Sequence, residues 1–131
     1  MTMSPGTTAL LIIEHDASVR QLYVRTLREP YLILEAQTVD ECCRIFATHQ
    51  ICTVIIEPHR PDGLGDVLMQ TVRSHCSRRL IPIVVCSVLD AVQDSHHSGV
   101  YRHFVKPVAP ERLRAEIFRI LSNHHGSQVL H

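Results

Sequence analysis

Short apolar runs recur along the chain, and each is too short to form a helix of ordinary length. Four of them are almost continuously hydrophobic: 9–13, Ile33 with its neighbours, 54–56 and 81–86. A fifth run, over 101–105, is more polar. Continuous apolar runs indicate strands that are buried on both faces, which is typical of a parallel sheet covered by helices.

Segments with helical periodicity alternate with these runs. The first begins near Asp16 or Ser18, either of which can cap it, and the second opens on the capping box Thr38–Glu41. The fourth, over 90–97, is short and polar, whereas the fifth has Pro110 in its first turn. The apolar faces of the first, second, third and fifth segments consist of Val19, Leu22, Tyr23 and Leu27; Ile45 and Phe46; Val67, Leu68 and Val72; and Leu113, Ile117, Ile120 and Leu121.

The order of strand and helix, repeated five times, predicts a doubly wound α/β fold. Right-handed crossovers would place helices on both faces of a five-stranded parallel sheet, so we expect three layers. The length favours one domain, which we place at 8–123, with tails at 1–7 and 124–131.

Polar residues follow the carboxyl ends of the predicted strands. In open α/β sheets, ligands bind beyond these ends, near the point where the strand order reverses. The ends carry Glu14–Asp16, Glu57–His59, Ser87 and Lys106. The fold rule alone therefore predicts where the chemistry of this chain would lie.

Composition narrows the function classes. The 131 residues are 45% hydrophobic and carry 13 basic and 13 acidic side chains, so no electrostatic footprint for nucleic acid or an anionic membrane is present. No apolar run is long enough to span a bilayer. The five cysteines lack CxxC spacing, which favours reduced thiols in a cytoplasmic protein. We expect four of them to be buried small residues: Cys42, Cys43, Cys52 and Cys86.

Four segments, in order and over about residues 8–122, resemble the response-regulator receiver domain of two-component signalling. They are Leu11–Asp16 followed by Val19 and Arg20, Val54–Glu57 with Pro61 and Gly63, Pro82–Ser87, and Phe104–Pro107. The resemblance implies a flavodoxin-like (βα)5 fold. It also implies an acidic pocket that binds Mg²⁺ and an aspartate that accepts a phosphoryl group. Ser87 and Lys106 match the hydroxyl residue and the lysine of the family's site.

The chain departs from this pattern at the chemically decisive positions. Glu57 stands at the position of the acceptor aspartate, and its carboxylate is displaced by one methylene, which would spoil the geometry of in-line attack. The two acidic-pocket positions hold Glu14 and His15, and imidazole is a poor ligand for Mg²⁺. We therefore expect weak or lost Mg²⁺ binding and no bound cofactor.

His103 lies where the family usually places a rotating switch aromatic, two residues before Val105. It could contribute to the partner-binding face of receivers. In this chain that face would consist of the predicted helix over 90–97, the strand over 101–105 and the helix over 110–121. The alternative is a half-exposed histidine on an edge strand. Candidate partners on this face are a histidine kinase, an output domain or a second copy of the chain.

Three functions are weighed against one another. The first is a non-enzymatic, atypical pseudo-receiver that binds a protein partner, with a direct or water-bridged contact between Glu57 and Lys106. The second is a phosphoacceptor with a degenerate site. The third is a module for a transition metal such as Zn²⁺, held by Glu14, His15, Glu57 and His59. Simpler interpretations also stay open, in which Glu57 is solvated, His15 bonds the backbone and Ser87 only ends a strand.

Overall fold

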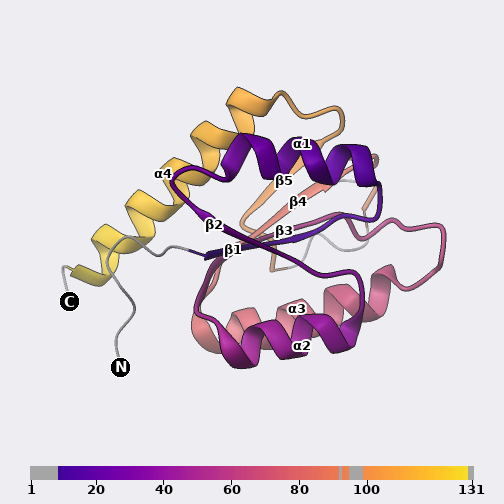
Figure 1. Cartoon of the computed structure of the whole chain (residues 1–131), viewed down its shortest axis with the longest axis horizontal. Helices are drawn as coiled ribbons and strands as arrows, with labels where there is room; N and C mark the ends of the chain where they lie inside the picture. Colours follow the sequence, from indigo (N-terminus) through magenta and orange to yellow (C-terminus); the bar gives the residue numbers. More distant parts are fainter. Residues whose placement is uncertain (1–8, 92, 95–98, 130–131) are drawn as a thin grey trace.

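The computed structural model describes the backbone of residues 9–91, 93–94 and 99–129, and the side chains of these residues up to 123 (Figure 1). In these ranges, five parallel strands form one sheet in the order β2-β1-β3-β4-β5, which confirms the predicted doubly wound topology. The strands are β1 Ala9–Ile13, β2 Leu32–Glu35, β3 Ile51–Ile56, β4 Ile83–Ser87 and β5 Arg102–Val105.

Two pairs of helices cover the two faces of the sheet and complete the three layers. Figure 1 shows α1 (Ala17–Leu27) and α4 (Pro110–Val129) on one face, with α2 (Val39–Thr48) and α3 (Gly65–Arg79) on the other. Alternate residues of β1 point into the two resulting cores, because successive side chains of a strand face opposite sides. The core therefore runs along both faces of the sheet and leaves the strand ends for the site.

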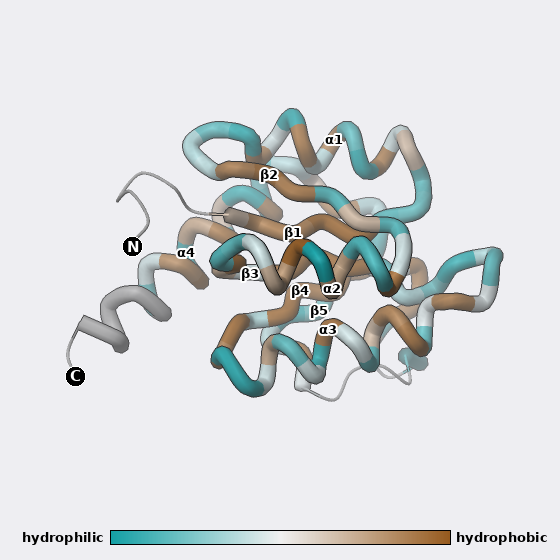
Figure 2. Tube along the Cα trace, turned by 60° about the horizontal axis from the view of Figure 1, so that its bottom comes forward, coloured by the Kyte–Doolittle hydropathy of each residue, from teal (hydrophilic) through white to brown (hydrophobic). Residues whose placement is uncertain are grey.

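Burial of the strands follows the predicted pattern, with one exception at the edge. All residues of β1 and β4 are buried, and Figure 2 shows the hydrophobic strands enclosed between helices of mixed character. In contrast, β2 is an edge strand whose residues are only partly buried or exposed, with Leu32 at 42% exposure. The expectation of burial on both faces was wrong there, because an edge strand has a neighbour on one side only.

Capping residues set the starts of two helices as the sequence predicts. Asp16, and not Ser18, caps α1, since its Oδ1 accepts a hydrogen bond of 3.0 Å from the backbone N–H of Val19. The Thr38 hydroxyl accepts a bond of 3.1 Å from the N–H of Glu41, and the Glu41 carboxylate accepts one of 3.1 Å from the N–H of Thr38. The predicted capping box is therefore present, and it fixes where the chain turns after β2.

Several positions differ from the sequence interpretation. Val67 is 43% exposed, because the buried stripe of α3 runs through Gly65, Leu68 and Met69 and passes Val67 by. Cys43 is exposed and Cys52 is partly buried, so only Cys42 and Cys86 of the four cysteines behave as predicted. The backbone of α4 stays helical to Val129, beyond the boundary expected at residue 123.

The segment expected to form the fourth helix is described only in part. One turn is visible, in which the N–H of Gln93 donates to Asp90 Oδ1 (2.8 Å) and the N–H of Asp94 donates to the Asp90 carbonyl (2.9 Å). Residues 92 and 95–98 lie outside the described residues. The helix over 90–97 therefore stays a prediction.

A stacked ring pair joins α2 to α3. The rings of Phe46 and His75 lie with centroids 4.5 Å apart and nearly parallel, and the guanidinium of Arg79 lies 5.7 Å from the Phe46 ring centre. Burial, and then the positive charges of Arg79 and Arg78, lower the pKa of His75 below its usual value. The folded protein therefore resists protonation of this imidazole.

The lowered pKa of His75 predicts a loss of stability in mild acid. The unfolded chain takes up the proton first, so the free energy of unfolding should fall as the pH drops below about 6.5. His75→Phe keeps a ring against Phe46 and removes the titrating group, and it should flatten this part of the profile. Urea unfolding across the pH range measures the effect, with His49→Phe as the exposed-histidine control. Equal acid slopes in His75→Phe and the unaltered protein would contradict the assignment.

Candidate functional site at the carboxyl ends of the strands

A cavity of about 720 Å³ opens where the carboxyl ends of β1, β3, β4 and β5 converge. This is the position that the strand pattern predicts. Its walls come from the loops after these strands and from the first turns of α1 and α3. The lining residues are His15, Asp16, Val19, Glu57, Pro58, His59, Arg60, Pro61, Gly63, Gly65, Asp66, Val88 and Lys106.

Glu57 is buried beneath this cavity, with 2% of its surface exposed. Its Oε2 accepts a hydrogen bond of 3.0 Å from the backbone N–H of His59, and its Oε1 accepts one of 3.2 Å from the backbone N–H of Val88. The interpretation of Glu57 as a solvated carboxylate was therefore wrong. Both of its oxygens are held by the chain itself.

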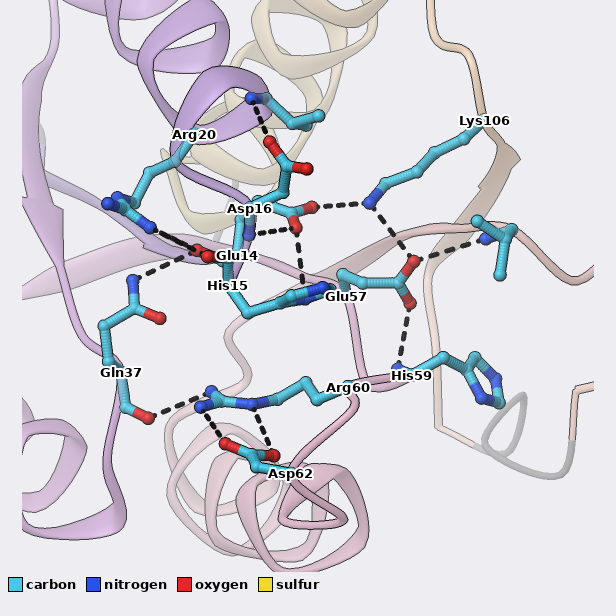
Figure 3. A network of polar contacts seen from close by, with 12 residues as sticks. Glu14, His15, Asp16, Arg20, Gln37, Glu57, His59, Arg60, Asp62 and Lys106 are labelled. Atoms are coloured by element: carbon cyan, nitrogen blue, oxygen red, sulfur yellow. Dashed lines mark hydrogen bonds and ion pairs between the residues drawn. The ribbon is translucent and has the colours of Figure 1, made fainter.

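The ammonium group of Lys106 lies between two buried carboxylates (Figure 3). Its Nζ is 2.7 Å from Glu14 Oε1 and 3.2 Å from Glu57 Oε1, so the predicted contact between Lys106 and Glu57 is present. Burial opposes the charge on this lysine, but the hydrogen bond and charge of Glu14, followed by the charge of Glu57, outweigh it and raise the pKa of Lys106. The lysine is thus an internal counter-cation for the acidic pocket.

His15 lies beside Glu14 at the cavity wall. Its Nδ1 is 3.4 Å from Glu14 Oε2, an oxygen that also accepts a hydrogen bond of 3.0 Å from the backbone N–H of Asp16. The imidazole therefore faces a carboxylate, and not the backbone as one interpretation held. Lys106 and the backbone N–H of Asp16 each engage one oxygen of Glu14.

Side-chain bonds to backbone carbonyls tie the loops around the cavity together. The carbonyl of Glu14 accepts hydrogen bonds from Arg20 Nη1 (2.8 Å) and Gln37 Nε2 (3.0 Å). Arg60 then donates from Nη1 to the carbonyl of Gln37 (2.9 Å) and forms a two-pronged pair with Asp62. These bonds join the loops after β1, β2 and β3, as Figure 3 shows. The sequence interpretation missed Gln37 and Arg60. Gln37 follows the end of a strand, so the rule that ligands bind beyond the carboxyl ends of the strands (the strand-end rule) could have selected it.

Glycine positions the start of α3 against the loop that follows Glu57. A Cβ on Gly65 would lie 1.5 Å from the carbonyl oxygen of Pro58, so no other residue fits without a backbone shift. Gly63, two residues earlier, has a φ of 76°, which favours glycine in the turn. The floor of the cavity therefore depends on a close approach of two backbones.

His59 and His103 meet at Asp94, beside the cavity. Nε2 of His59 is 3.2 Å from Asp94 Oδ1, and Nδ1 of His103 is 3.7 Å from Asp94 Oδ2. Nε2 of His103 donates to the carbonyl of Leu89 at 2.7 Å, and its side chain is 8% exposed. His103 is thus nearly buried, unlike the half-exposed histidine of the alternative interpretation, and the structure adds Asp94, which the sequence did not single out.

Ser87 has a local role in the structure. It is fully buried, and its hydroxyl oxygen accepts a hydrogen bond of 3.1 Å from the backbone N–H of Leu89. The carbonyl of the same residue accepts one of 2.8 Å from the N–H of Lys106. Ser87 therefore helps to hold the end of β5 in register with β4 and so places Lys106.

The proposed transition-metal site is not formed. Within the described part of the chain, no group of three or more His, Cys, Asp or Glu side chains is arranged to hold a metal ion. The set of Glu14, His15, Glu57 and His59 fails because the ring of His59 turns to Asp94, while Lys106 lies between the two glutamates. That alternative was wrong, since fourfold convergence requires every side chain to point to one place.

Solved structures show which class of protein has this fold. The chain matches a CheY-like response-regulator receiver domain from Methanospirillum hungatei JF-1 with a TM-score of 0.78 at 18% identity, covering 92% of this chain and 98% of that one. It matches the response regulator TrrA from Thermotoga maritima, solved in complex with Mg²⁺-BeF, with a TM-score of 0.71 at 18% identity, covering 87% of this chain and 99% of that one. The fold is that of response-regulator receiver domains.

Sequence relatives agree with the fold. The chain is 30% identical over 118 residues to the probable transcriptional regulator ycf27 of Cyanidium caldarium, which is 86% of this chain and 45% of that protein. The chain spans about half the length of the curated relatives it matches. No protein-family model matches it. The sequence relatives are transcriptional regulators, and the structural neighbours have the receiver-domain fold that the four sequence segments predicted. Among the helices in the described ranges, none is long and apolar enough to cross a membrane.

Proposed function

We propose that this chain is an atypical receiver domain of two-component signalling that acts as a protein-interaction module, without an acyl phosphate on Glu57. One observation carries the proposal. Lys106 Nζ bridges Glu14 and Glu57 at 2.7 and 3.2 Å, in the pocket where a receiver would hold its metal ion. The chain therefore supplies its own cation.

The hydrogen bonds of the pocket argue against Mg²⁺ coordination. Mg²⁺ requires near-octahedral oxygen ligands and gives up its waters reluctantly. Here both oxygens of Glu57 accept backbone N–H bonds, and the oxygens of Glu14 face Lys106, Asp16 and His15. A metal ion would have to displace Lys106 and share its place with an imidazole.

The same contacts disfavour Glu57 as a nucleophile. A carboxylate that accepts two backbone hydrogen bonds and faces an ammonium has most of its acceptor sites engaged and both oxygens held in place, whereas attack on phosphorus needs an oxygen in line with the leaving group. These contacts instead hold the loops around the pocket in one conformation. Because a carboxylate has one charge where a phosphoryl group has about two, Glu57 imitates a phosphorylated residue only in part.

The partner surface of this proposal is the face formed by β5, α4 and the segment before β5. Large apolar side chains are exposed there: Tyr101 at 51%, Val105 at 49% and Phe118 at 65%. Exposed apolar groups gathered on one face are typical of protein contacts. A histidine kinase, an output domain or a second copy of the chain would bind there in the cytoplasm, with no chemical step and no contact to nucleic acid or membrane by this chain.

The response to Mg²⁺ tests the proposal. Thermal unfolding should be unchanged by millimolar Mg²⁺, because a metal that binds only the native state would raise the midpoint. The matched control is the double variant His15→Asp with Glu57→Asp, which restores two short carboxylates and should gain a saturable rise. A saturable rise in the unaltered protein would contradict the proposal that Lys106 takes the place of the metal ion.

A further inference from the structure

Three arginines gather on the face of the molecule where the edge strand β5 meets α4. The guanidinium carbon of Arg102, on β5, lies 5.0 Å from the centre of the Phe104 ring. That of Arg112, in the first turn of α4, lies 5.4 Å from the same ring centre. Arg119 follows two turns later on the same side of α4. We call Arg102, Arg112 and Arg119 the arginine cluster.

Within the residues that the structure describes, one carboxylate contacts this cluster. Glu116 forms an ion pair with Arg119 and lies 3.8 Å from Nε of Arg102, so two arginines share it. Arg112 is exposed, and its guanidinium forms no ion pair in the described part of the chain. Glu111 precedes it but sits about 100° away around the helix axis. Three guanidiniums facing one carboxylate leave two positive charges in excess.

The Phe104 ring presents two of the guanidiniums in a form that suits carboxylates. A guanidinium over an aromatic ring uses its face for the ring and keeps its N–H edge for planar hydrogen bonds. Nε of Arg102 is buried and has no acceptor among the described residues, which is unfavourable for a donor. The two distances to the ring centre limit the separation of the charges to about 10 Å, comparable with the Debye length in physiological salt. A carboxylate bound there would supply the missing acceptor and reduce the repulsion.

An exposed aromatic side chain borders the cluster. Tyr101 is 51% exposed. The hydrogen bond and the charge of Glu116 raise the pKa of Arg119, and the phenol of Tyr101 is near enough to add to this effect. Tyrosine and arginine are among the residues that contribute most to binding at protein interfaces. The face therefore combines an aromatic contact with an excess of positive charge.

We propose that the arginine cluster binds an acidic segment of a partner protein, with carboxylates of the segment paired to Arg102 and Arg112 and its backbone packed against Tyr101. The occupant is not a second copy of the chain bound face to face. A two-fold interface would set the cluster against itself, and like charges across an interface oppose binding. The inference rests on the proposed function, because it names the chemistry of the partner at the face proposed there.

Titration of the full isotope-labelled chain with a synthetic peptide of glutamates and one central leucine tests the inference by NMR. We expect saturable binding that shifts the Nε–H signals of Arg102 and Arg112 and weakens as salt is added. Arg112→Gln should weaken binding about tenfold, the effect of losing one charge-assisted contact. Arg112→Lys keeps the charge but loses the planar fork, so it should also weaken binding. Glu116→Gln removes the competing carboxylate and should tighten binding, which a merely structural role of the cluster does not predict.

The matched control is Arg78→Gln, which removes the same charge from an exposed arginine of α3 on the other face of the sheet and should leave binding unchanged. A peptide with lysine for glutamate should not bind. The inference is overturned if the glutamate peptide does not bind, if Arg112→Gln binds it equally well, or if a single-stranded oligonucleotide binds the cluster more tightly. It is also overturned if the two Nε–H signals shift with the concentration of the chain alone, because the cluster would then pair with itself.

Failure of this inference is distinguishable from failure of the proposed function. A chain whose thermal midpoint ignores Mg²⁺ and that does not bind the peptide retains the proposed function and loses the inference. A chain that gains stability from Mg²⁺ and binds the peptide contradicts the proposed function but retains the site for an acidic segment.

Discussion

Lys106→Met should lower the free energy of unfolding by about 3–5 kcal/mol, the cost of leaving buried charge without its partner. Lys106 Nζ contacts both Glu14 and Glu57, which are 1% and 2% exposed, so the substitution leaves two carboxylates facing each other out of water. An exposed ion pair would cost only about 0–1 kcal/mol. Denaturant unfolding distinguishes the two cases.

Neutralising the carboxylates should reverse much of this loss. Glu57→Gln in the Lys106→Met background should cost less than in the unaltered protein, with a coupling energy of about 0.5–3 kcal/mol, and adding Glu14→Gln should recover more. Lys106→Arg is the control, because it keeps the charge. Strict additivity of Glu57→Gln and Lys106→Met would mean that the two residues do not interact.

The raised pKa of Lys106 gives this prediction a pH signature. A group whose pKa is higher in the folded state stabilises the fold below its unfolded value, about 10.4 for lysine, and loses that contribution as the pH rises through the folded value. The full difference in the free energy of unfolding between the unaltered protein and Lys106→Met should therefore be present at neutral pH. It should shrink only in strong alkali.

The fold was predictable because its signals are local and repeated. Runs such as Ala9–Ile13 and Ile83–Ser87 leave both faces buried, and the capping box at Thr38 fixes a helix start within a few residues of sequence. The same signal fails for β2 and for Val67, where burial depends on the number of neighbours. Periodicity within one segment does not carry that information.

The site was predictable as a place, but less so as a set of contacts. The strand-end rule brought Glu14, Glu57 and Lys106 together, and the structure places them within ion-pair distance. The bond of Gln37 to the carbonyl of Glu14 spans 23 positions, and Asp94 meets the ring of His59 across 35. Such contacts depend on how loops fold over the sheet, which no local pattern records.

Glu57 should not accept a phosphoryl group, whereas an aspartate at this position should accept one. One additional C–C bond, about 1.5 Å, moves the carboxylate from the geometry of in-line attack, where ångström-level misplacement already costs large factors in rate. Its oxygens are also occupied by the N–H groups of His59 and Val88 and by Lys106. The double variant His15→Asp with Glu57→Asp shortens the carboxylate and restores the second acidic ligand.

Intact-mass measurement after incubation with acetyl phosphate and Mg²⁺ tests the central claim most directly. The unaltered protein should show no adduct of about 80 Da, the mass of one phosphoryl group. The double variant His15→Asp with Glu57→Asp is the positive control and should gain such an adduct. A stoichiometric adduct on Glu57 of the unaltered protein would show that this chain is a conventional phosphoacceptor and would contradict the account.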